Sequence, residues 1–113
     1  MKINKENKTD PLTLEILLYI IDMVNFLMKF HLLHQKLNKF DIMIEIIQMI
    51  KIHENPLIMK SLTATLLESS KITTFYPDLL KDQSLNILLN KVISYTIEPN
   101  SLNNIFECIR NII

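Results

Sequence analysis

Apolar residues recur along the chain at the three- and four-residue spacing that is typical of α-helices. The spacing is clearest after Thr9 and Asp10, either of which can cap a helix, and after Pro11, which suits a first helical turn. The apolar positions that follow are Leu12, Leu14, Ile16, Leu17, Ile20, Ile21 and Val24. The pattern continues to about residue 37, which is long for one globular helix, so we expect a break near Asn25.

Turn-forming residues divide the rest of the chain into five further helical elements. In the segment NKFD, Asn38 can take the left-handed conformation and Asp41 can cap the next helix. We expect helices at 41–53, at 56–71, around 77–82, from about 84 to 95 and from 100 onward, with 71–77 as a connector. The helix at 56–71 is predicted to bury Leu57, Ile58, Leu62, Leu66 and Leu67.

A period of 45 residues relates these elements to one another. It pairs Pro11 with Pro56, Leu17 with Leu62, Ile21 with Leu66, Ile47 with Val92, Ile50 with Tyr95 and Asn55 with Asn100. Two helices rich in Ile and Leu match at some offset by chance, so the apolar pairs alone prove little. The proline and asparagine pairs, and the single offset that aligns helix, turn and next helix, favour an internal repeat.

Composition narrows the classes of protein that fit this pattern. The 113 residues include no glycine, which excludes the standard phosphate-binding loops and the nucleophile elbow. Twelve basic and twelve acidic residues balance, so nucleic acid is not expected as the main partner. The single cysteine cannot form an internal disulfide, which favours an intracellular location, cytoplasmic or nuclear. We expect one domain at 11–113 after a polar tail at 1–10.

A repeat of 40 to 47 residues with two or three helices is the size class of the armadillo and HEAT families. The segment DIMIEIIQMIKIHENPLIMKSLTATLLESS resembles the second and third helices of an armadillo repeat, and LLKDQSLNILLNKVISYTIEPNSLNNIFECIRNI resembles the next unit. The resemblance implies an all-α, right-handed superhelical bundle of about two and a third units that acts as a protein-interaction scaffold or adaptor. The Trp and Asn ladder of importin-like members is missing, so binding of nuclear signals is not implied.

A second resemblance covers about half of the chain. The segment LTATLLESSK at 62–71 is similar to the last helix of the TFIIS N-terminal domain, with Ser70 at the position of that family's hallmark Trp. This alternative implies a regulatory module of transcription elongation. It leaves the 45-residue period unexplained.

Few residues are placed for chemistry. His31 and His34 would share a helix face, but no Cys, Asp or Glu near them in sequence completes a metal site. Cys108 has no nearby histidine and fits a small core residue better than a nucleophile. We therefore predict no enzyme activity, no cofactor and no metal. Glu15, Asp22 and Lys29 interrupt the most apolar run, which disfavours a membrane span.

Two surfaces are expected to contact a protein partner, either a peptide or a helix. In armadillo-like stacks the last helix of each unit lines the binding face. The matching polar positions are Glu15, Tyr19 and Asp22, then Lys60, Thr63 and Glu68, then Asn103, Glu107 and Arg110. Ordinary solvated helix faces would give the same pattern. The terminal helices are apolar around much of their circumference, at Ile112 among others, so one end is expected to dock on a larger protein or a second copy.

Overall fold

The computed structural model describes residues 11–94 and 98–113, and it is all-α throughout these ranges. The long helices are α1 (Pro11–Leu27), α3 (Ile42–Ile52), α4 (Pro56–Ser69), α6 (Asp82–Ile93) and α7 (Pro99–Ile112). Two short helices, α2 (His34–Lys39) and α5 (Tyr76–Leu79), each follow a 3₁₀ turn, at His31–Leu33 and Thr73–Phe75. The predicted tail at 1–10 lies outside the described residues.

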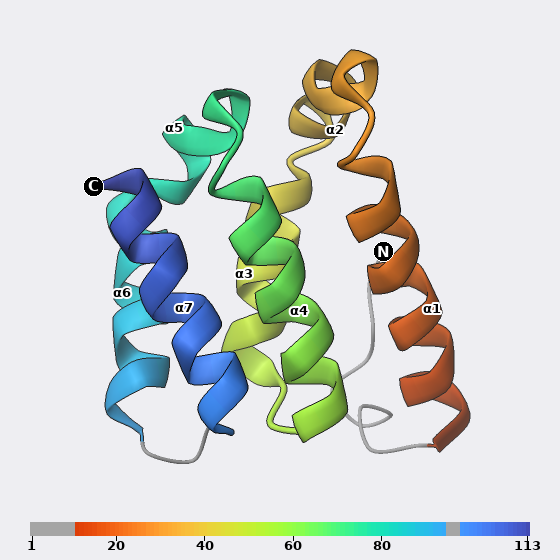
Figure 1. Cartoon of the computed structure of the whole chain (residues 1–113). Helices are drawn as coiled ribbons and strands as arrows, with labels where there is room; N and C mark the ends of the chain where they lie inside the picture. Colours follow the sequence, from red (N-terminus) through yellow and green to blue (C-terminus); the bar gives the residue numbers. More distant parts are fainter. Residues whose placement is uncertain (1–10, 95–97) are drawn as a thin grey trace.

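The long helices form two layers (Figure 1). Helices α1, α4 and α7 lie side by side and run in the same direction, while α3 and α6 form the second layer and run the opposite way. Helix α4 is the centre of the molecule, because it packs on α1, α3 and α7. Helices α2 and α5 sit together at one end of both layers. The two outermost elements of the first layer are therefore α1 and α7.

Capping residues and prolines explain where α4 and α7 begin. The Asn55 side-chain oxygen accepts hydrogen bonds from the backbone N–H groups of Leu57 and Ile58, and Pro56 follows at the first helical position. The Glu98 carboxylate accepts from the N–H groups of Asn100 and Ser101 in the same way, ahead of Pro99. Both caps supply acceptors to N–H groups that have no partner inside the helix.

The turn before α3 differs from the prediction in its residue roles. Asn38 lies inside α2, and Asp41 takes the left-handed conformation, with φ 55° and ψ 37°. The Asp41 side chain makes no cap, because its own backbone is turned away from the extended geometry that a capping residue needs. The predicted break in the first long segment is confirmed, since α1 ends at Leu27.

One apolar core joins the two layers. Ile47 on α3 and Leu62 on α4 lie at its centre and are 1% and 0% exposed, and the predicted burial of Leu62 is confirmed. Ile58 and Leu66 are buried as expected, and Leu67 is half-buried. The prediction for Leu57 is wrong: this side chain is 64% exposed, because it lies on the side of α4 opposite its buried face.

The same order of elements occurs twice, with a 3₁₀ turn, a short helix and two long antiparallel helices in each unit. Buried positions of α1 and α4 are 45 residues apart, as in Leu17 with Leu62 and Ile21 with Leu66. The second layer does not follow this offset: buried Ile47 of α3 matches buried Leu88 of α6, 41 residues on, and not Val92. The predicted match of Ile50 with Tyr95 lies outside the described residues.

Candidate functional site

The polar positions predicted to bind a partner are spread over three neighbouring helices. Glu15, Tyr19 and Asp22 on α1, Lys60 and Glu68 on α4, and Asn103 and Arg110 on α7 are exposed, and Glu107 is half-buried. Several of them pair with residues three or four positions away: the Tyr19 hydroxyl donates to Glu15 at 3.5 Å, Lys71 just past α4 pairs with Glu68 at 3.4 Å, and Arg110 pairs with Glu107 at 2.6 Å. Solvated helix faces account for these contacts as well as a binding groove does.

Two of the predicted binding residues are corrected by the structure, because they are buried. Thr63 is covered by α7, where the Asn104 side-chain amide donates to its hydroxyl at 3.2 Å. Ile112 packs into the core at the end of α7. A partner approaching the surface of the described residues would reach neither side chain.

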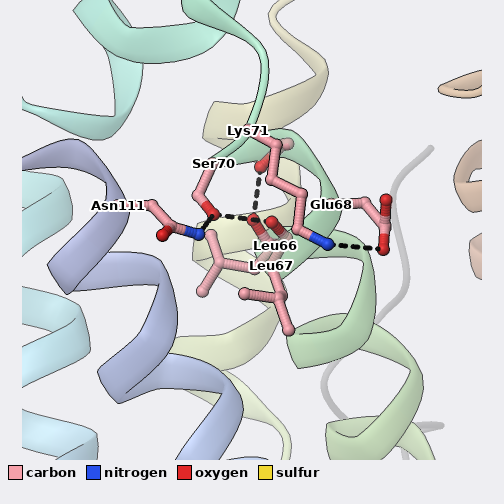
Figure 2. A network of polar contacts seen from close by, with 7 residues as sticks. Leu66, Leu67, Glu68, Ser70, Lys71 and Asn111 are labelled. Carbon is pink, nitrogen blue, oxygen red and sulfur yellow. Dashed lines mark hydrogen bonds and ion pairs between the residues drawn. The ribbon is translucent and has the colours of Figure 1, made fainter.

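Thr63 belongs to a polar ladder between α4 and α7. One heptad further along both helices, the Asn111 amide donates to the Ser70 hydroxyl at 2.9 Å, and Ser70 in turn donates to the Leu67 carbonyl at 2.6 Å (Figure 2). The two pairs, Asn104 with Thr63 and Asn111 with Ser70, are the rungs of this ladder. Each gives a hydrogen-bond partner to a polar side chain at a closely packed interface, as buried polar groups require. The ladder therefore fixes the register of α7 on α4, which is a structural role.

Cys108 lies between the two rungs of this ladder and is fully buried. Burial raises the pKa of its thiol to about 12, although a hydrogen bond with the Ser70 side chain acts in the opposite direction. A thiol with so high a pKa is almost entirely protonated near neutral pH, and the thiolate is the reactive form. The burial that we predicted for Cys108 is confirmed.

The histidines serve as packing and hydrogen-bonding groups. His34 is buried, its Nε2 donates to the Met28 carbonyl at 2.7 Å, and its ring lies 5.9 Å from that of Phe75, so it ties the two short-helix regions together. The His31 ring contacts the His34 ring edge-on at 5.4 Å. Within the described residues, no group of three or more His, Cys, Asp or Glu side chains is arranged to hold a metal ion.

A polar groove runs between α3 and α6 in the second layer. Its larger part has a volume of about 420 Å³ and is lined by Gln48, Lys51, Gln83, Asn86, Ile87 and Asn90. A smaller part of about 180 Å³ continues past Lys91, whose ammonium group donates to the His53 carbonyl at the end of α3 at 3.0 Å. The side-chain amides of this groove can both donate and accept hydrogen bonds.

The outer side of α1 carries the most regular apolar surface of the described residues. Six large side chains follow one another at intervals of four, three, four, three and four residues, and each is between 46% and 67% exposed. They are Leu12, Ile16, Tyr19, Met23, Phe26 and Phe30. We call this set the outer seam. Successive residues turn by about 100° around a helix, so the outer seam lies about 150° from the buried stripe of Leu17, Ile21 and Val24 that packs on α4.

Charged residues border the outer seam on one side only. Glu15 and Asp22 lie seven residues apart on α1, and Lys29 follows after another seven residues, in the turn just past the end of the helix. The Lys29 ammonium group lies 6.0 Å from the centre of the Phe26 ring, and the Phe30 ring contacts that of Phe26 edge-on at 5.2 Å. The aromatic contact carries the seam beyond the end of the helix. Residues at the other border, Ile20 and Leu27, are half-buried.

Tyr19 was predicted from the sequence as a binding residue, whereas the other five members of the outer seam were not. The signal was present in the sequence as two apolar stripes on opposite sides of one helix, each at three- and four-residue spacing. A stripe that faces the core and one that faces solvent look the same in sequence. Only the position of α1 at the end of its layer shows which stripe is exposed.

No single helix among the described residues is both long enough and apolar enough to cross a membrane. Taken together, the segments Pro11–Leu27 and His31–Lys39 reach that length and apolar character, but they are bent by 110° relative to each other. Comparison with protein-family models, with curated proteins and with solved structures finds no match to this chain.

Proposed function

We propose that the protein is a non-catalytic interaction module that binds a partner helix along the outer seam of α1. The observation that carries the proposal is the exposure of five large apolar side chains at heptad-like spacing on α1, continued by Phe30 just beyond its end, while the opposite side of the helix is already packed. Contiguous exposed apolar patches of several hundred Å² are often functional and mark interfaces. An intracellular location, cytoplasmic or nuclear, is part of the proposal because of the single cysteine.

The spacing defines the chemistry of the partner. A three- and four-residue alternation matches the apolar stripe of another α-helix, whose side chains would fill the gaps between Ile16, Tyr19 and Met23. An extended strand alternates every two residues and would match the seam poorly. The acidic and basic residues that border the seam, Glu15 and Lys29, would then select the orientation of the partner.

Among fold families, we propose an armadillo- or HEAT-like helical repeat, with the right-handed superhelix that this family implies. The repeated order of a short helix followed by two long helices supports this assignment. The alternative, a module resembling the TFIIS N-terminal domain, accounts for one unit of the two. In that alternative Ser70 would occupy an aromatic site, whereas Ser70 here holds Asn111 across a helix interface.

A photoreactive residue on the seam tests the function. Benzoylphenylalanine placed at position 19 is expected to form, on irradiation in cells that express the chain, an adduct whose second component is an α-helical protein segment. Matched placement at position 60, which is exposed on α4, is the control and is expected to give no such adduct. The function is contradicted if position 19 yields only lipid adducts, or if both positions yield the same adducts.

The amide-lined groove between α3 and α6 favours a second candidate function, the binding of an extended peptide. Gln83, Asn86 and Asn90 could pair with the main chain of such a peptide without regard to its side chains. Peptides selected from a random-sequence display library should lose binding to an Asn86→Ala, Asn90→Ala variant and retain binding to a Leu57→Glu variant. Selection of no peptide that depends on these asparagines contradicts this candidate.

A further inference from the structure

We propose that the helix that occupies the outer seam is α1 of a second copy of this chain, packed antiparallel across a two-fold axis. The inference rests on the proposed function, because it identifies the partner of the same surface. It is argued from the register of the seam, from the charges that border it and from the area that it exposes.

The outer seam is complementary to itself when one copy is reversed. With the axis near the middle of the helix, Tyr19 faces Met23 of the second copy, and Ile16 faces Phe26 of the second copy. Beyond these pairs, Leu12 lies near the end of α1 of the second copy, where Phe30 follows the helix. Each facing pair joins one residue from each of the two apolar positions of the heptad, as knobs-into-holes packing between antiparallel helices requires. Each facing pair also combines side chains of different shape, which interdigitate better than identical ones.

The charged border supports the same orientation. In the antiparallel register the stripe of one copy lies beside the stripe of the other, so Glu15 faces Lys29 of the second copy and Lys29 faces Glu15 of the second copy. Two attractive pairs then flank the axis. Asp22 faces Asp22 of the second copy at the axis itself, which is a like-charge contact at an exposed position. A parallel pair would instead place the charged stripe against the apolar border that contains Ile20 and Leu27.

The exposed area is sufficient for a modest dimer. Large side chains present roughly 150 to 250 Å² each, and about half of each seam residue is exposed, so one copy offers on the order of 600 Å². Two copies would bury on the order of 1,200 Å², the lower limit of stable interfaces, so we expect a weak dimer that dissociates on dilution. A two-fold contact of this kind closes on itself and yields dimers, not fibres.

Sedimentation equilibrium of the full chain over a wide concentration range tests the dimer. Wild type is expected to shift from monomer to dimer and no further. Met23→Glu, next to the axis, is expected to weaken association by more than about tenfold, because each copy would bury a carboxylate without a counter-charge. Leu57→Glu is the matched control, since Leu57 is as exposed as the seam residues but lies on α4, and it is expected to dimerise like wild type.

Cross-linking through single introduced cysteines tests the orientation. Asp22→Cys places two thiols face to face at the axis and is expected to give a disulfide-linked dimer under mild oxidation. Glu15→Cys places its two thiols two heptads apart, roughly 20 Å along the helix, and is expected to give none. Buried Cys108 does not compete in either variant. Equal cross-linking of the two variants contradicts the antiparallel register.

Reversal of the bordering charges gives an independent readout. Glu15→Lys alone and Lys29→Glu alone each create two like-charge pairs and should weaken the dimer by roughly threefold to tenfold. The double variant restores both attractive pairs and should recover wild-type association. Circular dichroism of every variant checks that the helices are retained. Lack of recovery in the double variant overturns the proposed pairing.

The two proposals fail in different ways. A chain that stays monomeric at every concentration, or that grows beyond dimers, overturns the self-pairing. If the photoreactive position 19 then captures a helix of a different protein, the proposed function stands and only its occupant changes. If the chain instead binds lipid vesicles through the seam and captures no protein helix, both proposals are wrong.

Discussion

At the residue scale, Asp41 marks the position where side-chain type and backbone shape fit least well. Among the described residues it alone has a positive φ, in a chain that contains no glycine. An aspartate tolerates the left-handed region better than most residues because its short side chain can bond locally, but the conformation still costs energy relative to glycine. The turn needs this geometry to send the chain from α2 into α3.

Asp41→Gly is therefore expected to raise the free energy of unfolding by about 0.5 to 1 kcal/mol, since glycine adopts this conformation without a steric penalty. Asp41→Val should lower it by more than about 1 kcal/mol, because a β-branched residue is strongly disfavoured there. Urea denaturation of both variants checks the prediction. If the two substitutions act in the same direction, the left-handed turn is not the reason for their effects.

Core residues make the largest single contributions at this scale. Ile47→Ala and Leu62→Ala are each expected to lower the free energy of unfolding by about 2 to 5 kcal/mol, because both side chains are enclosed and their removal leaves a cavity. Leu57→Ala, at an exposed site on the same helix as Leu62, should cost less than about 1 kcal/mol. A loss below about 1 kcal/mol at Ile47 or Leu62 would contradict the packing of the two layers.

At the scale of elements, Pro56 and Pro99 with their caps define where the last helix of each unit, α4 or α7, begins. Asn55 and Glu98 perform the same task with different chemistry, an amide oxygen in one case and a carboxylate in the other. Hydrogen bonds from the backbone N–H of Asn100, and from the backbone N–H and hydroxyl of Ser101, hold the pKa of the Glu98 carboxyl below its ordinary value of 4.5. Of these two caps, the carboxylate cap of α7 is therefore the one that is sensitive to pH.

A pKa that is lowered in the folded state stabilises the protein above the ordinary pKa, and this stabilisation is lost as the pH falls through the folded value. Wild type should therefore lose stability more steeply than Glu98→Gln as the pH falls below 4.5, because the glutamine keeps an acceptor oxygen but does not titrate. Urea denaturation in a series of acidic buffers compares the two slopes. Parallel slopes would show that Glu98 makes no such contribution.

The sequence predicted most of the helices but not their registers. The offset of 45 residues holds between α1 and α4, whereas α3 and α6 are offset by 41, which differs by one helical turn. A shift of one turn keeps an apolar stripe on the same face, so pattern alone cannot detect it. Between α4 and α7 the offset is 43, and the match of Asn55 with Asn100 is wrong, because Glu98 provides the equivalent cap.

The surface was harder to predict for a related reason. Thr63 has the polarity of a surface residue, but Asn104 satisfies its hydroxyl from a helix that is 41 positions away. Such a contact depends on the neighbour, and the sequence of α4 carries no sign of it. The exposed state of Met23 and Phe26 depends in the same way on α1 being the last helix of its layer.

At the scale of the whole molecule, protection from solvent is unequal among the parallel helices. Helix α4 is covered on three sides, by α1, α3 and α7, whereas α1 packs on α4 and exposes its outer seam. Elements with fewer buried contacts open at lower free energy than the rest of a structure. We therefore expect amide hydrogens to exchange faster in α1 than in α4 when the chain is dilute.

The proposed dimer adds a concentration dependence to this order. At concentrations where two copies pair, exchange in α1 should slow, because opening that helix would also break the interface, while exchange in the middle of α4 should change little. Met23→Glu should remove the concentration dependence of α1 and leave α4 as in wild type. Hydrogen exchange followed by mass spectrometry, at two protein concentrations, resolves the two helices as separate peptides. Slowing that is equal in α1 and α4 would indicate general stabilisation, and slowing confined to α7 would place the contact at the opposite end of the layer.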